Sequence, residues 1–265
     1  MKFDKYKLYE YSVQTPETHT EFFKQAYSEI TGRKARFLRE DFCGTFINSI
    51  HWVKDDPEHH AIAYDLDLEP LDYGKTHHLS KLTPQQKSRL HFAQKNATSV
   101  SRPLVDIQAA CNFSFFILKD PATLAAYFKS SLKSLRSGGL LVLEMAGGPG
   151  FVAELKEWKK MKRGAQHWFT YVWEQRKFDP ISHHGECAIH FKFPNGHYAK
   201  NVFQYDWRIW TIPEVTDALK QAGFIKTFVY WEDATPGGMF KGTYRQTERA
   251  ENDYTWISYI IGQKE

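Results

Sequence analysis

Acidic residues and one glycine near the start of the chain have a spacing that suits a nucleoside-bearing ligand. Glu40 and Asp41 precede Gly44 in a predicted turn, and Asp65 follows further along the chain. An acid about 20 residues after such a turn accepts hydrogen bonds from ribose hydroxyls, while the turn lets the backbone approach the ligand. A dinucleotide site needs more glycines and fewer acids, which argues against an NAD-dependent oxidoreductase. The residues favour a ribose-bearing cofactor with a cationic end.

The elements that position these residues form a strand–turn–helix–strand unit. We predict a strand over 35–39, an acidic tight turn over 40–45, an amphipathic helix, and a second strand over 61–64 that ends at Asp65. The amino end of the helix presents free N–H groups beside the turn. This unit predicts a ligand site at the end of the first two strands.

The alternation of strands and helices continues through residue 145. Strands are predicted over 89–93, 105–111 and 140–145, and the run 105–111 is apolar enough to be buried on both faces. A helix starts at Pro121, with Asp120 as its cap, and stops at Gly138. This order predicts an α/β fold with a doubly wound, mostly parallel sheet.

The hydrophobic period changes in the second half of the chain. Segments 168–178, 186–193 and 198–208 are typical of three strands joined by turns, and they predict an appended antiparallel β layer. A capped helix and a final β-hairpin, with strands over 225–231 and 256–261, then complete the core sheet. The predicted regions are a lid or helical segment over 1–34, the cofactor-binding core over 35–150, an antiparallel substrate-covering insertion over 151–210, and the C-terminal helix and hairpin over 211–265.

Composition excludes several classes of protein. The net charge of +4 over 265 residues is too weak to indicate nucleic-acid binding by itself. One basic run is either a solvated helix face or a contact for an acidic partner; its members are Lys156, Lys159, Lys160, Lys162 and Arg163.

The cysteines and histidines indicate neither disulfides nor a metal site. The 3 cysteines are odd in number and form no C-x-x-C pair, and no secretory leader is evident, so we expect a reduced, cytoplasmic protein. The 12 histidines lack metal-ligand spacing, and we expect no metal. No apolar run approaches the roughly 18 residues of a membrane span.

The turn and the acid after the second strand resemble those of class I S-adenosylmethionine-dependent methyltransferases. Their pattern is E/D-x-G-x-G-x-G, of which this chain keeps Gly44, while Phe46 replaces a usual glycine. The segments L-R-E-D-F-C-G-T over 38–45 and D-L-D-L-E over 65–69 are similar to one subgroup of that superfamily, and the likeness covers nearly the whole chain. The resemblance implies a seven-stranded, Rossmann-like sheet and S-adenosyl-L-methionine as cofactor, and it leaves the acceptor open.

The resemblance also implies roles for single residues. Gly44 and its turn would cradle the methionine end, and Asp65 would accept two ribose hydroxyls, whereas Asp67 is better placed to cap the next helix. Glu40 would hold the cofactor ammonium or lie solvated at the surface. Asn112 would lie near the cofactor, at the carboxyl end of a central strand.

Other predicted cofactor contacts have plain alternatives. Arg39 reaches the cofactor carboxylate or pairs with a nearby acid, and Asn96 bonds adenine, with the N–H of Ala97, or merely turns the chain. The predicted cofactor site comprises Arg39, Glu40, Phe42, Cys43, Gly44, Thr45, Asp65, Leu66, Asp67, Asn96, Ala97, Asn112 and Phe113.

Aromatic residues are expected to enclose a methyl acceptor beneath a lid formed by the N-terminal segment and the antiparallel layer. An aromatic box favours a cationic amine or a planar ring, and core packing is the alternative for each ring. The predicted acceptor site comprises Tyr6, Tyr9, Tyr11, Ser114, Trp173, Glu174, Gln175, Trp207 and Arg208.

The leading interpretation is a methyltransferase that acts on nitrogen or oxygen of a small molecule. The alternatives are a nucleic-acid (RNA) methyltransferase, which would need a basic surface beside the pocket, and a non-catalytic S-adenosylmethionine-binding protein. We predict no membrane contact, assign no catalytic base and predict no oligomeric state.

Overall fold

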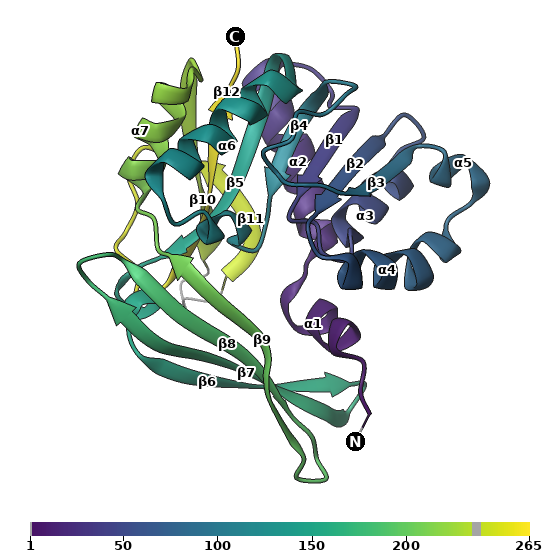
Figure 1. Ribbon diagram of the computed structural model, residues 1–265, viewed down its shortest axis with the longest axis vertical. Coiled ribbons are helices and arrows are strands. Elements are labelled where there is room, and N and C mark those ends of the chain that lie inside the picture. Colours follow the sequence, from purple (N-terminus) through teal and green to yellow (C-terminus); the bar gives the residue numbers. More distant parts are fainter. Residues whose placement is uncertain (1, 235–239) are drawn as a thin grey trace.

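A computed structural model describes residues 2–234 and 240–265, which form two β-sheets with helices around the larger one (Figure 1). Among these residues the larger sheet has eight strands in the order β11-β10-β12-β5-β4-β1-β2-β3. The strands are β1 Phe37–Asp41, β2 His60–Asp65, β3 Leu90–Gln94, β4 Val105–Ala110, β5 Leu135–Gly147, β10 Lys226–Ala234, β11 Phe240–Gln246 and β12 Trp256–Gln263. The pairs from β3 to β5 are parallel, and β12, β10 and β11 add antiparallel strands at one edge.

Helices cover both faces of the larger sheet because its strands are apolar on both faces. In β2, Ala61 and Ala63 belong to the core beneath α2 (Pro16–Thr31) and α3 (Ile47–Asp55), whereas Ile62 and Tyr64 belong to the opposite core. That opposite core lies beneath α6 (Pro121–Ser134) and α7 (Ile212–Ala222). Figure 1 shows the two helix pairs on opposite sides of the strands.

Caps and short helices fix where the chain turns. The Asp120 side chain accepts hydrogen bonds from Ala122 N and Thr123 N at the start of α6, and Thr211 forms a capping box with Glu214 at the start of α7. The remaining short elements are α4 Leu68–His77, η1 Leu79–Lys81, α5 Pro84–Lys87, η2 Ser114–Ile117 and η3 Pro149–Val152.

The second sheet is antiparallel and carries its own small core. Its order is β6-β7-β8-β9, with β6 Leu155–Arg163, β7 Gln166–Asp179, β8 His184–Lys192 and β9 Tyr198–Arg208. Helix α1 (Lys5–Val13) contributes Leu8 to this core, beside Phe169 and Phe191. Figure 1 shows the second sheet below the larger one, with α1 beside it.

The structure confirms the α/β class with a mostly parallel sheet and corrects four details. Strand β11 lies in the predicted long loop of the final hairpin, so the larger sheet exceeds seven strands. The basic run around Lys159 is an exposed edge strand, β6, and not a helix face, so the antiparallel layer has a fourth strand. Lysines on an edge strand discourage pairing with other chains.

The other two corrections concern element ends. Strand β1 continues through Glu40 and Asp41, which were predicted to lie in the turn, and α6 ends at Ser134 because β5 already begins at Leu135. No helix in the described part of the chain is long and apolar enough to cross a bilayer.

Candidate functional site

A cleft of about 360 Å³ opens at the carboxyl ends of β1, β2 and β4, within the roughly 300–1,000 Å³ usual for small-molecule sites. Residues after these strands form one wall, and residues of α1 and β9 form the other. The cleft is lined by Tyr6, Tyr9, Gln14, Phe42, Gly44, Thr45, Asp65, Asp67, Pro70, Asn112, Ser114, Ile117, Phe203, Gln204, Tyr205 and Trp207.

Gly44 and Asp65 meet at the centre of this edge. The Gly44 N–H donates to Asp65 Oδ2 at 2.7 Å, and Asp65 Oδ1 accepts from Asp67 N at 2.9 Å. Gly44 has φ +53°, and a Cβ built on it would meet no atom within 4 Å. The turn therefore presents bare backbone to open space, beside a carboxylate whose remaining lone pairs can accept hydroxyl hydrogens.

The backbone around the cleft adopts left-handed conformations at residues that carry side chains. Phe42, Phe46, Asn112 and Phe113 have φ between 48° and 57°. Each such residue costs about 1–3 kcal/mol, and such residues cluster at ligand sites in other proteins. The surrounding packing therefore holds both turns in shapes that the chain alone disfavours.

The two acids at the end of β1 point to opposite faces of the sheet. Glu40 accepts hydrogen bonds from Asn48 Nδ2, Ser49 N and Ser49 Oγ at 2.6–2.9 Å, and burial raises its pKa to about 7. Asp41 accepts from Tyr127 Oη and Gln108 Nε2 on the other face. Both carboxyls are buried within the sheet, so neither lines the cleft.

Arg39 is fully buried and pairs with Asp41, Nε to Oδ1, at 2.7 Å. Its other N–H groups donate to the carbonyls of Ser99 and Ala97 and to Ser134 Oγ. The structure thus shows the acid-paired alternative for Arg39, facing away from the cleft. Asn96 Oδ1 accepts from Thr98 N and Oγ1, which is the chain-turning alternative.

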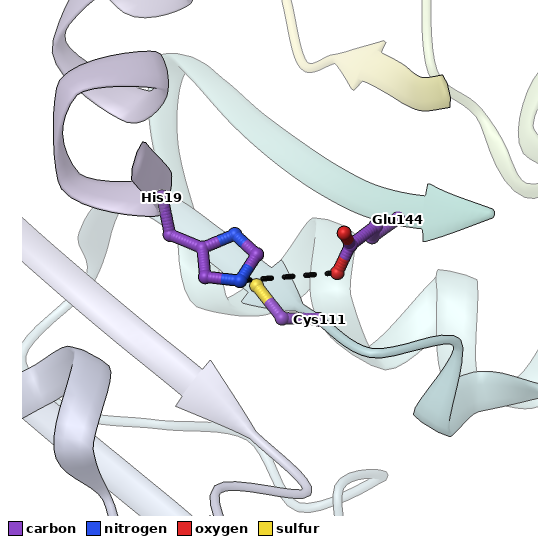
Figure 2. A group of neighbouring side chains, drawn as sticks. All are labelled: His19, Cys111 and Glu144. Atoms are coloured by element: carbon purple, nitrogen blue, oxygen red, sulfur yellow. Dashed lines mark ion pairs between the residues drawn. The ribbon is translucent and has the colours of Figure 1, made fainter. Parts of the chain in front are cut away.

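His19, Cys111 and Glu144 form a buried polar cluster (Figure 2). Glu144 Oε2 accepts the backbone N–H of Asn112 at 2.5 Å and lies 4.0 Å from His19 Nε2, while His19 Nδ1 lies 2.6 Å from Tyr259 Oη. Cys111 completes a group of possible metal ligands whose atoms lie within 4.8 Å of one another. Burial raises the pKa of Glu144 to about 7 and lowers that of His19 to about 4, so at neutral pH His19 is uncharged and Glu144 is only partly ionised.

A second cavity of about 280 Å³, called the chamber from here on, adjoins the cleft and is lined by residues of both sheets. Both cavities are lined by Tyr9, Asn112, Tyr205 and Trp207. The other chamber residues are Val13, Phe113, Phe151, Glu157, Tyr171, Trp173, Gln175, Ile189, Thr255 and Ile257. A ligand in the chamber would therefore lie next to a ligand in the cleft.

Strand alternation decides which residues of β7 reach the chamber. Trp173 and Gln175 face inward, and Glu174 between them faces outward, where it pairs with Lys156, Arg176 and His190. Hydrogen bonds from these groups, that of Lys156 first, lower the pKa of Glu174 to about 2. Glu174 is thus part of a half-buried charge network and not of the chamber lining.

Of the predicted cofactor residues, those that line the cleft or the chamber are Phe42, Gly44, Thr45, Asp65, Asp67, Asn112 and Phe113. The linings leave out Arg39, Glu40, Cys43, Leu66, Asn96 and Ala97. Of the predicted acceptor residues, the cavities are lined by Tyr6, Tyr9, Ser114, Trp173, Gln175 and Trp207. The linings leave out Tyr11, Glu174 and Arg208. The Tyr11 hydroxyl donates to the Lys162 carbonyl, and Arg208 pairs with Glu214.

The sequence prediction missed several lining residues. Phe203 and Tyr205 alternate with Trp207 along β9, so the two-residue period was a usable signal. Gln14 has no such signal, because it lies in the short connection between α1 and α2. Its Oε1 is buried without a hydrogen-bond partner.

The fold is similar to solved structures of methyltransferases. An S-adenosylmethionine-dependent methyltransferase from Clostridium acetobutylicum ATCC 824 has 15% identity and a TM-score of 0.70, with 98% of each chain covered. DesVI from Streptomyces venezuelae has 17% identity and a TM-score of 0.70, with 100% of each chain covered. CalS10, an amino pentose methyltransferase from Micromonospora echinaspora in a structure with bound S-adenosylmethionine, has 14% identity and a TM-score of 0.67 over 100% of this chain and 98% of that one.

Neither a model of a known protein family nor a curated protein matches the chain. At these identities the structural likeness establishes the fold: this chain has the Rossmann-like fold of class I methyltransferases, which confirms the predicted architecture.

Proposed function

We propose that this protein is an S-adenosylmethionine-dependent methyltransferase that acts on a small molecule, at nitrogen or oxygen. The observation that carries the proposal is the meeting of Gly44 and Asp65, N to Oδ2 at 2.7 Å, at the edge where a sheet of this kind binds ligands. The aromatic chamber next to this point supplies a place for the acceptor.

The chemistry of the cleft fits this cofactor. Asp65 and Asp67 are its charged lining residues, and among the described lining residues none is Lys, Arg or His. Such a cleft suits a sulfonium and an ammonium and disfavours the pyrophosphate of a dinucleotide. The unpaired Oε1 of Gln14 offers one further acceptor for an ammonium or hydroxyl hydrogen.

We assign separate roles to the lining residues. The Asp65 carboxylate would accept hydrogen bonds from the ribose hydroxyls, and the backbone of Gly44 and Thr45 would hold the methionine end of the cofactor. Asn112 would stand at the border between cofactor and acceptor, since it lines both cavities.

When bound, S-adenosylmethionine supplies a methyl group on a positively charged sulfur, which is already an activated leaving group. The residues of this chain then have to align the acceptor and keep water out. Tyr9, for which burial raises the pKa to about 12, would remain a neutral wall at physiological pH.

The size of the chamber supports a small molecule as acceptor. CalS10 is named an amino pentose methyltransferase and KedS8, another similar structure, a sugar N-methyltransferase, so this fold takes small acceptors elsewhere. The basic strand β6 contributes only Glu157 to the chamber lining among the described residues, which weakens the nucleic-acid alternative.

The direct test is methyl transfer from methyl-tritiated S-adenosylmethionine to a panel of small amines and phenols, with S-adenosylhomocysteine measured as coproduct. We expect turnover by the wild type, loss of it in Asp65→Asn, and wild-type turnover in Asp217→Asn, an exposed change on α7. Cofactor binding without any turnover across the panel would favour the non-catalytic alternative.

A further inference from the structure

The chamber is an unfilled space within an aromatic cluster. These rings line a partly open pocket of about 280 Å³. The aromatic members of its wall are Phe113, Phe151, Tyr171, Trp173, Tyr205 and Trp207, with Tyr9 shared with the cleft.

Three of these rings form a continuous wall. The centroids of Tyr205 and Trp207 lie 4.5 Å apart, and Trp173 lies 5.9 Å from Tyr205 and 6.1 Å from Trp207. Ring faces carry negative electrostatic potential, and indole attracts a cation most strongly. Three such rings side by side make a surface that prefers positive charge.

The formal charge in the chamber lining is also negative. Among the described residues that line the chamber, none is Lys, Arg or His, and Glu157 is the charged member, on the exposed strand β6. Burial, followed by the charges of Tyr9 and Glu157, raises the pKa of Tyr171, which keeps its hydroxyl neutral. An anionic ligand would meet no compensating charge here.

Two polar side chains of the chamber already use their hydrogen-bond donors. Trp173 Nε1 donates to Gln175 Oε1 at 3.0 Å, and Gln175 Nε2 donates to the carbonyls of Gly150 and Ala153 at 2.9 and 2.5 Å. These groups have little left to offer a phosphate or carboxylate, whereas ring faces and the Glu157 carboxylate remain available to a cation.

We propose that the chamber binds an organic ammonium group, and that the acceptor is a small amine with no phosphate or carboxylate in the part that lies in the chamber. For methyl transfer the ammonium first releases one proton to water, because only the free amine has a lone pair that can form the new nitrogen–carbon bond. The identity of the acceptor rests on the proposed methyl transfer, whereas the binding of a cation does not. A flat neutral ring is the competing occupant.

The test compares two probes of equal shape on the full-length protein. Choline carries a trimethylammonium group, and 3,3-dimethylbutan-1-ol replaces its nitrogen by carbon. Binding is followed by calorimetry and by tryptophan fluorescence. We expect choline to bind at least about tenfold more tightly, a difference of about 1.4 kcal/mol.

Two variants locate the binding site. Trp173→Leu removes a chamber ring and should weaken choline binding about tenfold while changing the neutral probe little. Trp158→Leu is the matched control, since Trp158 is 52% exposed on β6 and lies outside the chamber lining. The comparison of choline with its neutral isostere needs no variant, so it tests the preference for a cation even if Trp173→Leu does not fold.

The outcomes separate the two proposals. Equal or weaker binding of choline relative to its neutral isostere overturns the ammonium site, and preferred binding of a flat phenol identifies the competing occupant. If S-adenosylmethionine binds and choline does not, the chamber inference fails and the proposed function stands. If choline binds and S-adenosylmethionine does not, the ammonium site stands and the proposed function fails.

Discussion

Phe46 shows how single residues shape the turn over 42–46, where we propose that the cofactor binds. Its side chain is fully buried, its φ is +48°, and its ring stacks on Phe92 with centroids 4.7 Å apart. Gly74 of α4 makes room for it, because a Cβ at Gly74 would lie 2.5 Å from Phe46 Cε1 and would also clash with the carbonyl of Thr45. The phenylalanine at a usual glycine position is therefore matched by a glycine on the neighbouring helix.

Gly74→Ala should disturb this match. The added methyl must push the turn that holds Thr45 and Phe46, so we expect a loss of about 1–3 kcal/mol in unfolding free energy and weaker cofactor binding. Gly185→Ala is the matched control, since its Cβ would make only ordinary contact with Ile209 at 3.6 Å. Urea denaturation and cofactor titration of both variants measure these losses. Equal losses in Gly74→Ala and Gly185→Ala would show that Gly74 is not needed to make room for Phe46.

Glu144 should make stability depend on pH. Burial raises its pKa from 4.5 to about 7, so the unfolded chain gives up this proton at lower pH than the native state does. The stability that the group contributes is present below about pH 4.5 and is lost as the pH rises through 7. In Glu144→Gln the side chain cannot ionise, so the variant should gain about 2 kcal/mol relative to wild type between pH 5 and pH 8.

Urea denaturation at both pH values measures this difference. Glu154→Gln, at an exposed position, is the matched control and should follow the wild-type profile. If Glu144→Gln also follows the wild-type profile, Glu144 is not the group that titrates.

At the scale of elements, one side chain of α1 contacts both the turn after β1 and the residue that follows α4. Glu10 Oε1 accepts from Thr45 Oγ1 at 2.5 Å and lies 2.6 Å from His78 Nε2. The same helix brings Tyr6 and Tyr9 to the cleft wall. The position of the N-terminal segment is therefore coupled to the shape of the turn.

Glu10→Ala should loosen α1. Hydrogen bonds to a charged group contribute about 1.5–3 kcal/mol, so we expect roughly tenfold weaker cofactor binding and faster proteolysis within the first 15 residues. Glu21→Ala, which removes an exposed pair with Lys24 on α2, serves as control. Identical cleavage rates and affinities in the two variants would show that Glu10 does not hold the helix.

The elements differ in how far the sequence predicts them. Apolar runs predict the parallel strands, and chain order alone brings Gly44 and Asp65 to one edge. The end of β1 is not predictable, because Glu40 and Asp41 are stabilised there by Ser49 and Tyr127, partners from helices on opposite faces. Strand β6 is also hidden, since an edge strand exposed along most of its length shows no apolar alternation.

At the scale of the whole molecule, the cleft and the chamber lie between two sheets that the chain builds separately. The larger sheet supplies the turns after β1, β2 and β4, and the second sheet supplies the aromatic residues of β7 and β9. A cofactor bound between them would contact both sheets and α1. Ligand binding should therefore stabilise the assembly as a unit, by about 2.7 kcal/mol at a ligand concentration of 100 times Kd.

The most direct test of the central claim is calorimetric titration of the full-length protein with S-adenosylmethionine, with NADH as the comparison ligand. We expect the wild type and Asp217→Ala to bind S-adenosylmethionine and not NADH. Asp65→Ala, checked for folding by circular dichroism, should bind it about 1–3 kcal/mol more weakly, the scale of a lost buried hydrogen-bond partner. Absence of S-adenosylmethionine binding by the wild type, or undiminished binding by Asp65→Ala, would contradict the account.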